Sequence, residues 1–253
     1  MSSIGAHVAP GELLFDLPGG GHALFTTRAH GNMSSVGGLD HEHGRHARER
    51  LRTRLGLRRL ARGYQVHGTT VRRIHSRADM PAPDTDATQP PIEADGHATR
   101  IPGIGVMALA ADCLPIALGG AGAVAMVHAG WRGLAAGVLE EGVQALRALG
   151  AGGDIAAIVG PGAGPCCYEV GPEVHAAFAT HPALPASASA IAGASSGGGS
   201  PIDLRAIAHR RLHAAGVLDV RDAAACTICD TRFFSHRRES TDAGRQAGIA
   251  WLA

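Results

Sequence analysis

Short apolar runs along the chain predict buried strands, because each has strand length and is bounded by turn-forming residues. The clearest lie in the middle third, at residues 104–110 and 123–127. Between them, the run at 115–118 and the glycine-rich turn at 119–122 predict a hairpin. The runs lie at residues 24–27, 64–67, 70–74, 104–110, 115–118, 123–127, 155–159 and 248–252.

Three other stretches show apolar residues at helical spacing. Residues 41–62 are rich in arginine, with leucines that form one apolar side, and residues 134–149 carry a leucine and valine stripe that ends before Gly150. Asp203 stands where the N-cap of a helix running to about residue 215 is expected.

Strands and helices alternate without a regular βαβ rhythm, which favours an α+β or mixed α/β fold. A length of 253 residues suits one compact domain. Residues 78–92 are rich in proline, aspartate and threonine and predict a loop. Residues 183–201 are a low-complexity stretch of small residues, which we interpret as a mobile surface insertion within the domain.

Charge, hydropathy and the number of cysteines limit the partners and the cellular location that we expect. Twenty-three basic and 22 acidic residues leave a net charge of +1, so no nucleic acid partner is expected. The N-terminus lacks a signal-peptide pattern, and no run approaches the roughly 20 apolar residues that span a membrane. Five cysteines, an odd number, argue against a disulfide scaffold and favour the cytoplasm.

All 23 basic residues are arginine, and the chain has no lysine. This excludes Schiff-base chemistry and a P-loop lysine. Any bound anion must therefore contact arginine, histidine, backbone N–H groups or a metal.

Three predicted strands are followed by side chains that bind metals. His67, Cys113 and His128 form a two-imidazole, one-thiolate set that zinc accepts, and three protein ligands leave the fourth position open, as in catalytic sites. Taken singly, each residue is better explained as a packed cysteine or a surface histidine. Their spacing does not unite them, so only the fold can bring them together.

His128 begins the sequence His-Ala-Gly-Trp-Arg-Gly, a predicted strand-to-helix turn. Its glycines allow the backbone to approach a ligand, the following helix start suits an anion, and Trp131 could stack on a planar ring. The alternative is a tight turn with a packed tryptophan.

The other clusters carry less information. The histidines at 41, 43 and 46 fit a solvated helix start, whereas the arginines of residues 233–238 and Arg245 could hold phosphate or carboxylate. Cys226 and Cys229 have CxxC spacing without a second such pair, so we interpret them as structural. The adjacent Cys166 and Cys167 fit a packed loop or a reactive pair.

Several motifs together resemble the YfiH/laccase-domain family, also called the multicopper polyphenol oxidase or purine nucleoside phosphorylase family. They follow in the family order from about residue 24 to the C-terminus. Two departures concern residues 31–40 and 241–245, at the expected substrate-contacting periphery. The motifs are Thr26-Thr27-Arg28, Gln65-Val66-His67-Gly68, Ala94-Asp95-Gly96, Ala111-Asp112-Cys113-Leu114-Pro115, His128–Gly133, Cys166–Val170, Cys226-Thr227 and Phe233–Arg238.

The resemblance implies a single domain with β-sheets packed face to face between helical layers, an α-β-β-α sandwich. It also implies that His67, Cys113 and His128 bind one zinc ion at the active site. The same fold resembles a deamidase toxin with a cysteine–histidine pair, which would make Cys113 a nucleophile and His128 its base. Fold analogy alone is a weak warrant for that chemistry.

The activity implied by the resemblance is zinc-dependent phosphorolysis of adenosine, inosine, guanosine and methylthioadenosine, with adenosine deaminase activity at the same site. Asp112 and Glu169 are candidates for moving the proton. The candidates for binding substrate or phosphate are Arg28, Trp131, Arg132, Arg237 and Arg238.

Two alternatives remain open. A peptidoglycan precursor-editing amide hydrolase would use the same activated nucleophile and an arginine. Copper-dependent oxidation of phenols would use the same ligand set, but a laccase also needs a trinuclear cluster built from repeated His-x-His pairs. The chain has one such pair, His41 and His43.

Overall fold

The computed structural model describes residues 12–34, 41–81, 92–179 and 199–253. Most of the low-complexity stretch at 183–201 and of the loop at 78–92 lies outside the described residues. No helix in the described part of the chain is both long enough and apolar enough to cross a membrane.

One sheet has five strands in the order β1-β2-β13-β6-β3. The first four pair antiparallel, while β3 lies parallel to β6. The bounds are Leu13–Leu17 for β1, Gly21–Phe25 for β2, Gln246–Leu252 for β13, Ile104–Ala110 for β6 and Arg59–Ala61 for β3.

A second sheet has six strands in the order β12-β9-β7-β8-β5-β4. Its two edge pairs are parallel and its centre is antiparallel. The bounds are Asp219–Asp222 for β12, Gly152–Val159 for β9, Leu114–Ala121 for β7, Ala123–Ala129 for β8, Gly96–Thr99 for β5 and Val71–Ile74 for β4. A separate two-stranded ribbon pairs β10 (Glu169–Val170) with β11 (Ser200–Pro201).

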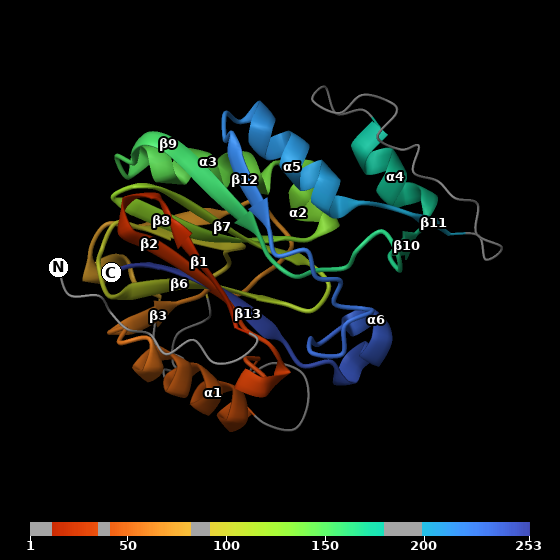
Figure 1. Cartoon of the computed structure of the whole chain (residues 1–253), viewed down its shortest axis with the longest axis horizontal. Helices are drawn as coiled ribbons and strands as arrows, with labels where there is room; N and C mark the ends of the chain where they lie inside the picture. Colours follow the sequence, from red (N-terminus) through yellow and green to blue (C-terminus); the bar gives the residue numbers. More distant parts are fainter. Residues whose placement is uncertain (1–11, 35–40, 82–91, 180–198) are drawn as a thin grey trace.

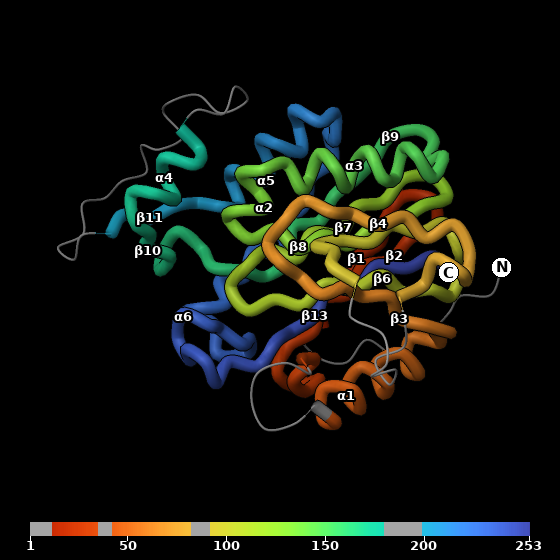
Figure 2. Tube along the Cα trace, turned by 180° about the vertical axis from the view of Figure 1, so that it is seen from behind, coloured from red at the N-terminus to blue at the C-terminus, as the bar shows by residue number. Residues whose placement is uncertain are grey.

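The two sheets pack face to face, and helices cover both outer faces (Figures 1 and 2). Phe25 and Val106 of the first sheet and Met126 and Ile158 of the second are fully buried in the layer between them. The expected α-β-β-α sandwich is therefore confirmed. On the first sheet lies α1 (His41–Arg54), and on the second lie α2 (Trp131–Ala136), α3 (Val138–Ala148) and α5 (Leu204–Ala214), with α4 (Pro172–Ala179) beside them.

The other helical segments of the described residues are short turns at the surface. They are α6 (His236–Glu239) and the 3-10 turns η1 (Pro18–Gly20), η2 (Arg28–His30), η3 (Arg77–Asp79) and η5 (Ser240–Asp242).

The helix predicted over 41–62 is too long. It ends at Arg54, because Gly56 takes a φ of +66° that a helix cannot contain, and β3 follows at Arg59. Leu55 and Leu60 still pack on the same outer core as Leu51, which is why the apolar spacing continued past the helix end.

The helix predicted over 134–149 is two helices. Gly137, with φ +108°, ends α2 and starts α3, so that the leucine stripe stays on one side although the axis changes. Gly150, with φ +80°, follows α3 as predicted, and Asp203 caps α5 by accepting a hydrogen bond from the Ala206 N–H at 2.9 Å.

Candidate metal centre and substrate cavity

Strand pairing brings two predicted ligands to one edge of the six-stranded sheet. His128 lies opposite Pro115 in the β7–β8 ladder, so Cys113, two residues before Pro115, lies beside the end of β8. Asp95 precedes β5, whose Gly96 lies opposite Val127, and its carbonyl accepts the His128 N–H at 2.6 Å. Sequence spacing could not show this, because it depends on which strands are neighbours.

His67 completes the group from the loop before β4. Its Nε2 lies 3.8 Å from the Cys113 Sγ, and its ring meets the His128 ring edge-on at 4.9 Å between centroids. One ligand atom from each of His67, Cys113 and His128 lies within 4.8 Å of the others. The structure thus places the three predicted ligands around a single point.

Asp95 fixes the orientation of this group, a role that the sequence analysis did not assign. Its buried carboxylate accepts from the Nδ1 of His128 at 2.8 Å and from the backbone N–H groups of Val66, His67 and Gly68 at 3.2, 3.0 and 2.8 Å. The Nε2 of His128 is thereby left for a metal, as in carboxylate–histidine–metal triads. The available signal was the Ala94-Asp95-Gly96 motif of the family resemblance.

Two close approaches explain the glycines after His128. A Cβ on Gly130 would lie 2.7 Å from the His67 ring and 3.0 Å from the Cys113 Sγ, and one on Gly133 would lie 2.7 Å from the Gly68 carbonyl oxygen. His67 itself has φ +60°, so the segment predicted as extended over 64–67 turns sharply at its end. Such strain is typical of functional sites.

The protein's own charges favour an ionised thiol. Burial by itself raises the pKa of Cys113, but the charge and hydrogen bond of His128 and the hydrogen bond of His67 outweigh burial and lower this pKa to about 6. Burial likewise lowers the pKa of His128, but the Cys113 thiolate and the Asp95 carboxylate raise it to about 9. Cys113 is therefore a thiolate near neutral pH.

This donor set fits a metal ion. It offers a thiolate and two imidazoles, one of them held by a buried carboxylate, and it faces a cavity from which a fourth ligand can enter. His67, Cys113 and His128 are therefore a group that could hold a metal.

The cavity has a volume of about 470 Å³, within the range of roughly 300–1,000 Å³ that is typical of small-molecule sites. Its walls combine basic and aromatic side chains. Besides the three potential ligands, they include Arg62, Tyr64, Asp112, Trp131, Arg132, Tyr168, His236, Arg237 and Arg245.

Two predicted arginines lie in this wall and cover aromatic rings. The guanidinium of Arg132 lies 4.2 Å from the centroid of the Trp131 ring, and that of Arg237 lies 5.2 Å from the centroid of the Tyr168 ring. Trp131 thus presents one face to its own neighbour, and both cations border the cavity.

Asp112 also lines the cavity, but both of its carboxylate oxygens are engaged. Oδ1 accepts from the Thr227 hydroxyl at 2.7 Å, and Oδ2 accepts from the Arg237 N–H at 2.6 Å. With φ +86°, this residue joins the Cys113 loop to the C-terminal segment.

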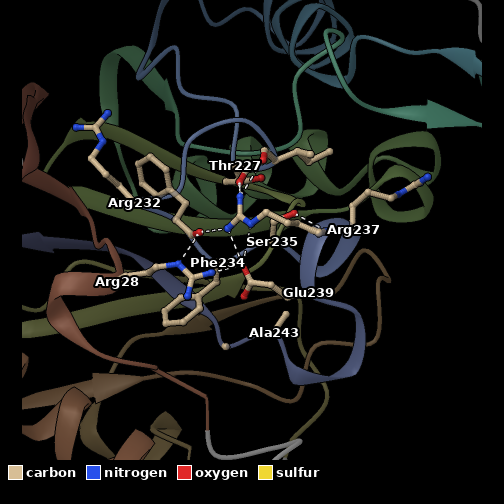
Figure 3. Close-up of polar contacts among 12 residues, drawn as sticks. Arg28, Thr227, Arg232, Phe234, Ser235, Arg237, Glu239 and Ala243 are labelled. Atoms are coloured by element: carbon tan, nitrogen blue, oxygen red, sulfur yellow. Dashed lines mark hydrogen bonds and ion pairs between the residues drawn. The ribbon is translucent and has the colours of Figure 1, made fainter.

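The structure does not bring Arg28, Arg238 or Glu169 to the cavity wall. Arg28 and Arg238 both pair with Glu239 and donate to the Phe233 carbonyl, so they hold the C-terminal segment together. Figure 3 shows Arg28 directed toward Glu239, whereas the side chain of Arg237 extends away from this cluster. Glu169 lies exposed on the β10–β11 ribbon.

Other residues of the wall were missed. Arg62 is the last residue of the helix predicted over 41–62, Tyr64 belongs to no motif, and Tyr168 belongs only to a motif of the family resemblance. Arg245 was noted only as one of several C-terminal arginines, and its guanidinium donates to the Ala243 and Gly244 carbonyls.

Residues 21–253 match the model of a family described as multi-copper polyphenol oxidoreductase laccase. The chain belongs to this family. A Xylella fastidiosa relative named purine nucleoside phosphorylase is 38% identical over 94% of this chain and 90% of its own length. The Escherichia coli relative, named purine nucleoside phosphorylase YfiH, is 38% identical over 74% of this chain and 72% of its own.

Solved structures of this laccase-like family share the whole architecture. YlmD from Geobacillus stearothermophilus superposes with a TM-score of 0.85 at 30% identity, over 97% of each chain. A Neisseria meningitidis protein superposes with a TM-score of 0.79 at 29% identity, over 95% of this chain and 98% of its own.

Proposed function

We propose that the chain is a purine nucleoside phosphorylase with zinc bound by His67, Cys113 and His128. The observation that carries this proposal is the cavity itself, in which a three-ligand metal set shares one wall with arginines and aromatic rings. Relatives that match most of the chain are named for this activity. The substrates that we propose are adenosine, inosine, guanosine and methylthioadenosine.

Phosphorolysis transfers the ribose C1′ from a purine ring nitrogen to a phosphate oxygen. The C–N bond breaks as the C–O bond forms, and the purine leaves with a proton on its ring. The enzyme must therefore hold a dianion close to a planar base. Arg132 and Arg237 provide guanidinium groups that suit phosphate, in a chain without any lysine.

The aromatic residues of the wall supply the base site. Trp131 and Tyr168 are half-buried and packed against the helical core, so their rings are held in fixed positions. A guanidinium group lies over each ring, so a cation stands beside each aromatic surface. Asp112 accepts a hydrogen bond from the backbone N–H of Arg237 and thereby positions this residue. Its other carboxylate oxygen accepts from the Thr227 hydroxyl, so neither oxygen is free for proton transfer in this arrangement.

We also propose adenosine deaminase activity in the same cavity. A zinc ion held by His67, Cys113 and His128 would supply an activated water for deamination, because zinc lowers the pKa of bound water to about 7. The chain's residues then act by binding: the arginines hold phosphate in one reaction, and the aromatic wall holds the base in both.

The five cysteines are all free thiols, and we place the activity in the cytoplasm.

One observation favours a second candidate function, amide hydrolysis of a peptidoglycan precursor. Cys113, His128 and Asp95 form a thiolate–imidazole–carboxylate line, the arrangement of a cysteine nucleophile and its oriented base. This mechanism needs no metal, so removal of zinc with a chelator separates it from phosphorolysis.

Copper-dependent phenol oxidation has no comparable support. His41 and His43 belong to α1, on the outer face of the five-stranded sheet, and the three-ligand group lies at the edge of the other sheet. Among the described residues, the one further group of potential metal ligands consists of cysteines.

The test is incubation of the zinc-loaded protein with adenosine, with and without phosphate. We expect adenine and ribose 1-phosphate only with phosphate, and inosine in both cases. Arg237→Ala should raise the KM for phosphate at least tenfold, whereas Arg232→Ala, whose exposed side chain pairs with Asp230, should leave it unchanged. If wild-type protein forms neither adenine nor inosine, the proposal is wrong.

A further inference from the structure

Four of the five cysteines come together outside the substrate cavity. Cys166 and Cys167 follow β9, and Cys226 and Cys229 follow β12; we call them the four-cysteine cluster. All four sulfur atoms lie within 4.8 Å of one another. The Cys229 Sγ lies 3.4 Å from that of Cys166 and 2.7 Å from that of Cys167. The CxxC pair of Cys226 and Cys229 is thus completed by Cys166 and Cys167, which lie about 60 residues earlier in the sequence.

The fold explains why these loops meet. Strands β9 and β12 are parallel neighbours, so both chains leave the same edge of the sheet after Val159 and Asp222. Beyond the strands the pairing continues, as the Gly162 N–H donates to the Ala225 carbonyl at 3.2 Å and the Thr227 N–H donates to the Gly162 carbonyl at 3.0 Å.

Backbone N–H groups and a cation surround the CxxC turn. The Gly164 N–H donates to the Cys226 Sγ at 3.2 Å, and the Cys229 N–H does the same across the CxxC turn. Arg238 donates to the Thr227 and Ile228 carbonyls at 2.8 Å, which places a positive charge against the same turn.

We propose that the four-cysteine cluster binds a second metal ion, one zinc in a closed tetrahedral site. Zinc–sulfur bonds of about 2.3 Å in a tetrahedron set the sulfur atoms about 3.8 Å apart, and the four sulfur atoms of the cluster all lie within 4.8 Å of one another. Four thiolates leave no open position, so the ion is structural. An iron–sulfur cluster, with several metal atoms, needs its cysteines farther apart.

This site supports the cavity. Thr227, inside the CxxC turn, donates to Asp112, the neighbour of Cys113, and Tyr168, the neighbour of Cys167, lies in the cavity wall. Zinc at the four-cysteine cluster therefore holds two loops that contact the active-site segment. The inference itself does not depend on which reaction the cavity catalyses.

The test is the metal content of the full-length reduced protein, with zinc as the probe. We expect two zinc ions per chain in the wild type and one in Cys113→Ser. With cobalt in place of zinc, Cys113→Ser should show thiolate-to-metal charge-transfer absorption, which only the four-cysteine cluster can supply. The double variant Cys113→Ser/Cys226→Ser should lose the remaining zinc ion and the charge-transfer absorption. The control variant Cys113→Ser/Ile228→Ala keeps all four sulfur atoms of the cluster and should retain the zinc ion and the absorption.

Alkylation of the wild-type protein provides a readout that needs no variant. Zinc should slow the modification of the four cysteines at least tenfold, and a chelator should restore the rate. The proposal is overturned if reduced Cys113→Ser binds no zinc, or if zinc leaves the alkylation rates unchanged. Disulfides that form among these cysteines, with no zinc bound after reduction, would overturn it too.

Discussion

At the residue scale, Asp95 orients two of the three predicted metal ligands, His67 and His128. Asp95 is not a ligand, but its carboxylate bonds to His128 and to the N–H groups of the segment that carries His67. The pKa of Asp95, which burial raises, is lowered overall by the hydrogen bond from His128 and by the backbone N–H groups. It therefore stays ionised and fixes both histidines.

Asp95→Asn should weaken zinc binding about 10- to 100-fold, because an amide orients His128 less well than a carboxylate does. Competition with a chelator of known affinity measures this change. Asp154→Asn, at an exposed position on β9, serves as the control and should bind zinc as the wild type does. Equal affinity in both variants would show that Asp95 does not act through the histidine.

Gly130→Ala should reduce zinc affinity and activity together, by at least tenfold, because the added methyl group meets His67 and Cys113. Gly152→Ala is the matched control, since an added Cβ there has no neighbour within 4 Å. Isothermal titration with zinc and circular dichroism would separate a local effect from unfolding. Unchanged affinity in Gly130→Ala would contradict the close approach.

At the scale of elements, the sequence predicted strands such as β6, β8 and β9, because burial of an apolar run is a local property. It did not predict β1, β3, β5 or β12, and residues 64–67 form only an isolated bridge at Tyr64. Sequence-based prediction failed where the outcome depends on the sign of a backbone φ angle or on which strands are neighbours in the sheet. Gly56 and Gly137 set the ends of α1 and α2 by taking positive φ values. Glycine can adopt either sign of φ, so the sequence alone does not show where a helix ends. The approach of Cys166 to Cys229 follows from the β9–β12 pairing and could not be seen in the spacing.

Strand β5 carries a titratable group that makes the sheet sensitive to acid. His97 is buried, and burial together with the charge of Arg72 lowers its pKa from 6.5 to about 4. The unfolded chain binds this proton more readily, so the stability contributed by neutral His97 is fully present above pH 6.5. It is lost as the pH falls toward 4.

His97→Gln should therefore lose less stability on acidification than the wild type does. From pH 7.5 to pH 5 the difference should be about 2 kcal/mol in the free energy of unfolding. Urea denaturation at the two pH values measures it, and His75→Gln, at an exposed position, should behave as the wild type does. Equal losses in His97→Gln and the wild type would show that His97 does not carry this sensitivity.

At the scale of the whole molecule, one edge of the six-stranded sheet collects the chemistry of the chain. The ends of β5, β7 and β8 place Asp95, Cys113 and His128, and the ends of β9 and β12 place the four-cysteine cluster. Loops from both groups meet at Asp112. The sandwich thus positions a candidate catalytic metal and a candidate structural metal along the same edge.

We propose that the metal site formed by His67, Cys113 and His128 performs phosphorolysis. The most direct measurement is zinc content together with ribose 1-phosphate formation, on the same samples of wild type, Cys113→Ala and His128→Ala. We predict that each variant loses one zinc ion per chain and that activity falls by at least a hundredfold, while the zinc of the four-cysteine cluster remains. Retention of all zinc in both variants, or full phosphorolysis without it, would contradict the account.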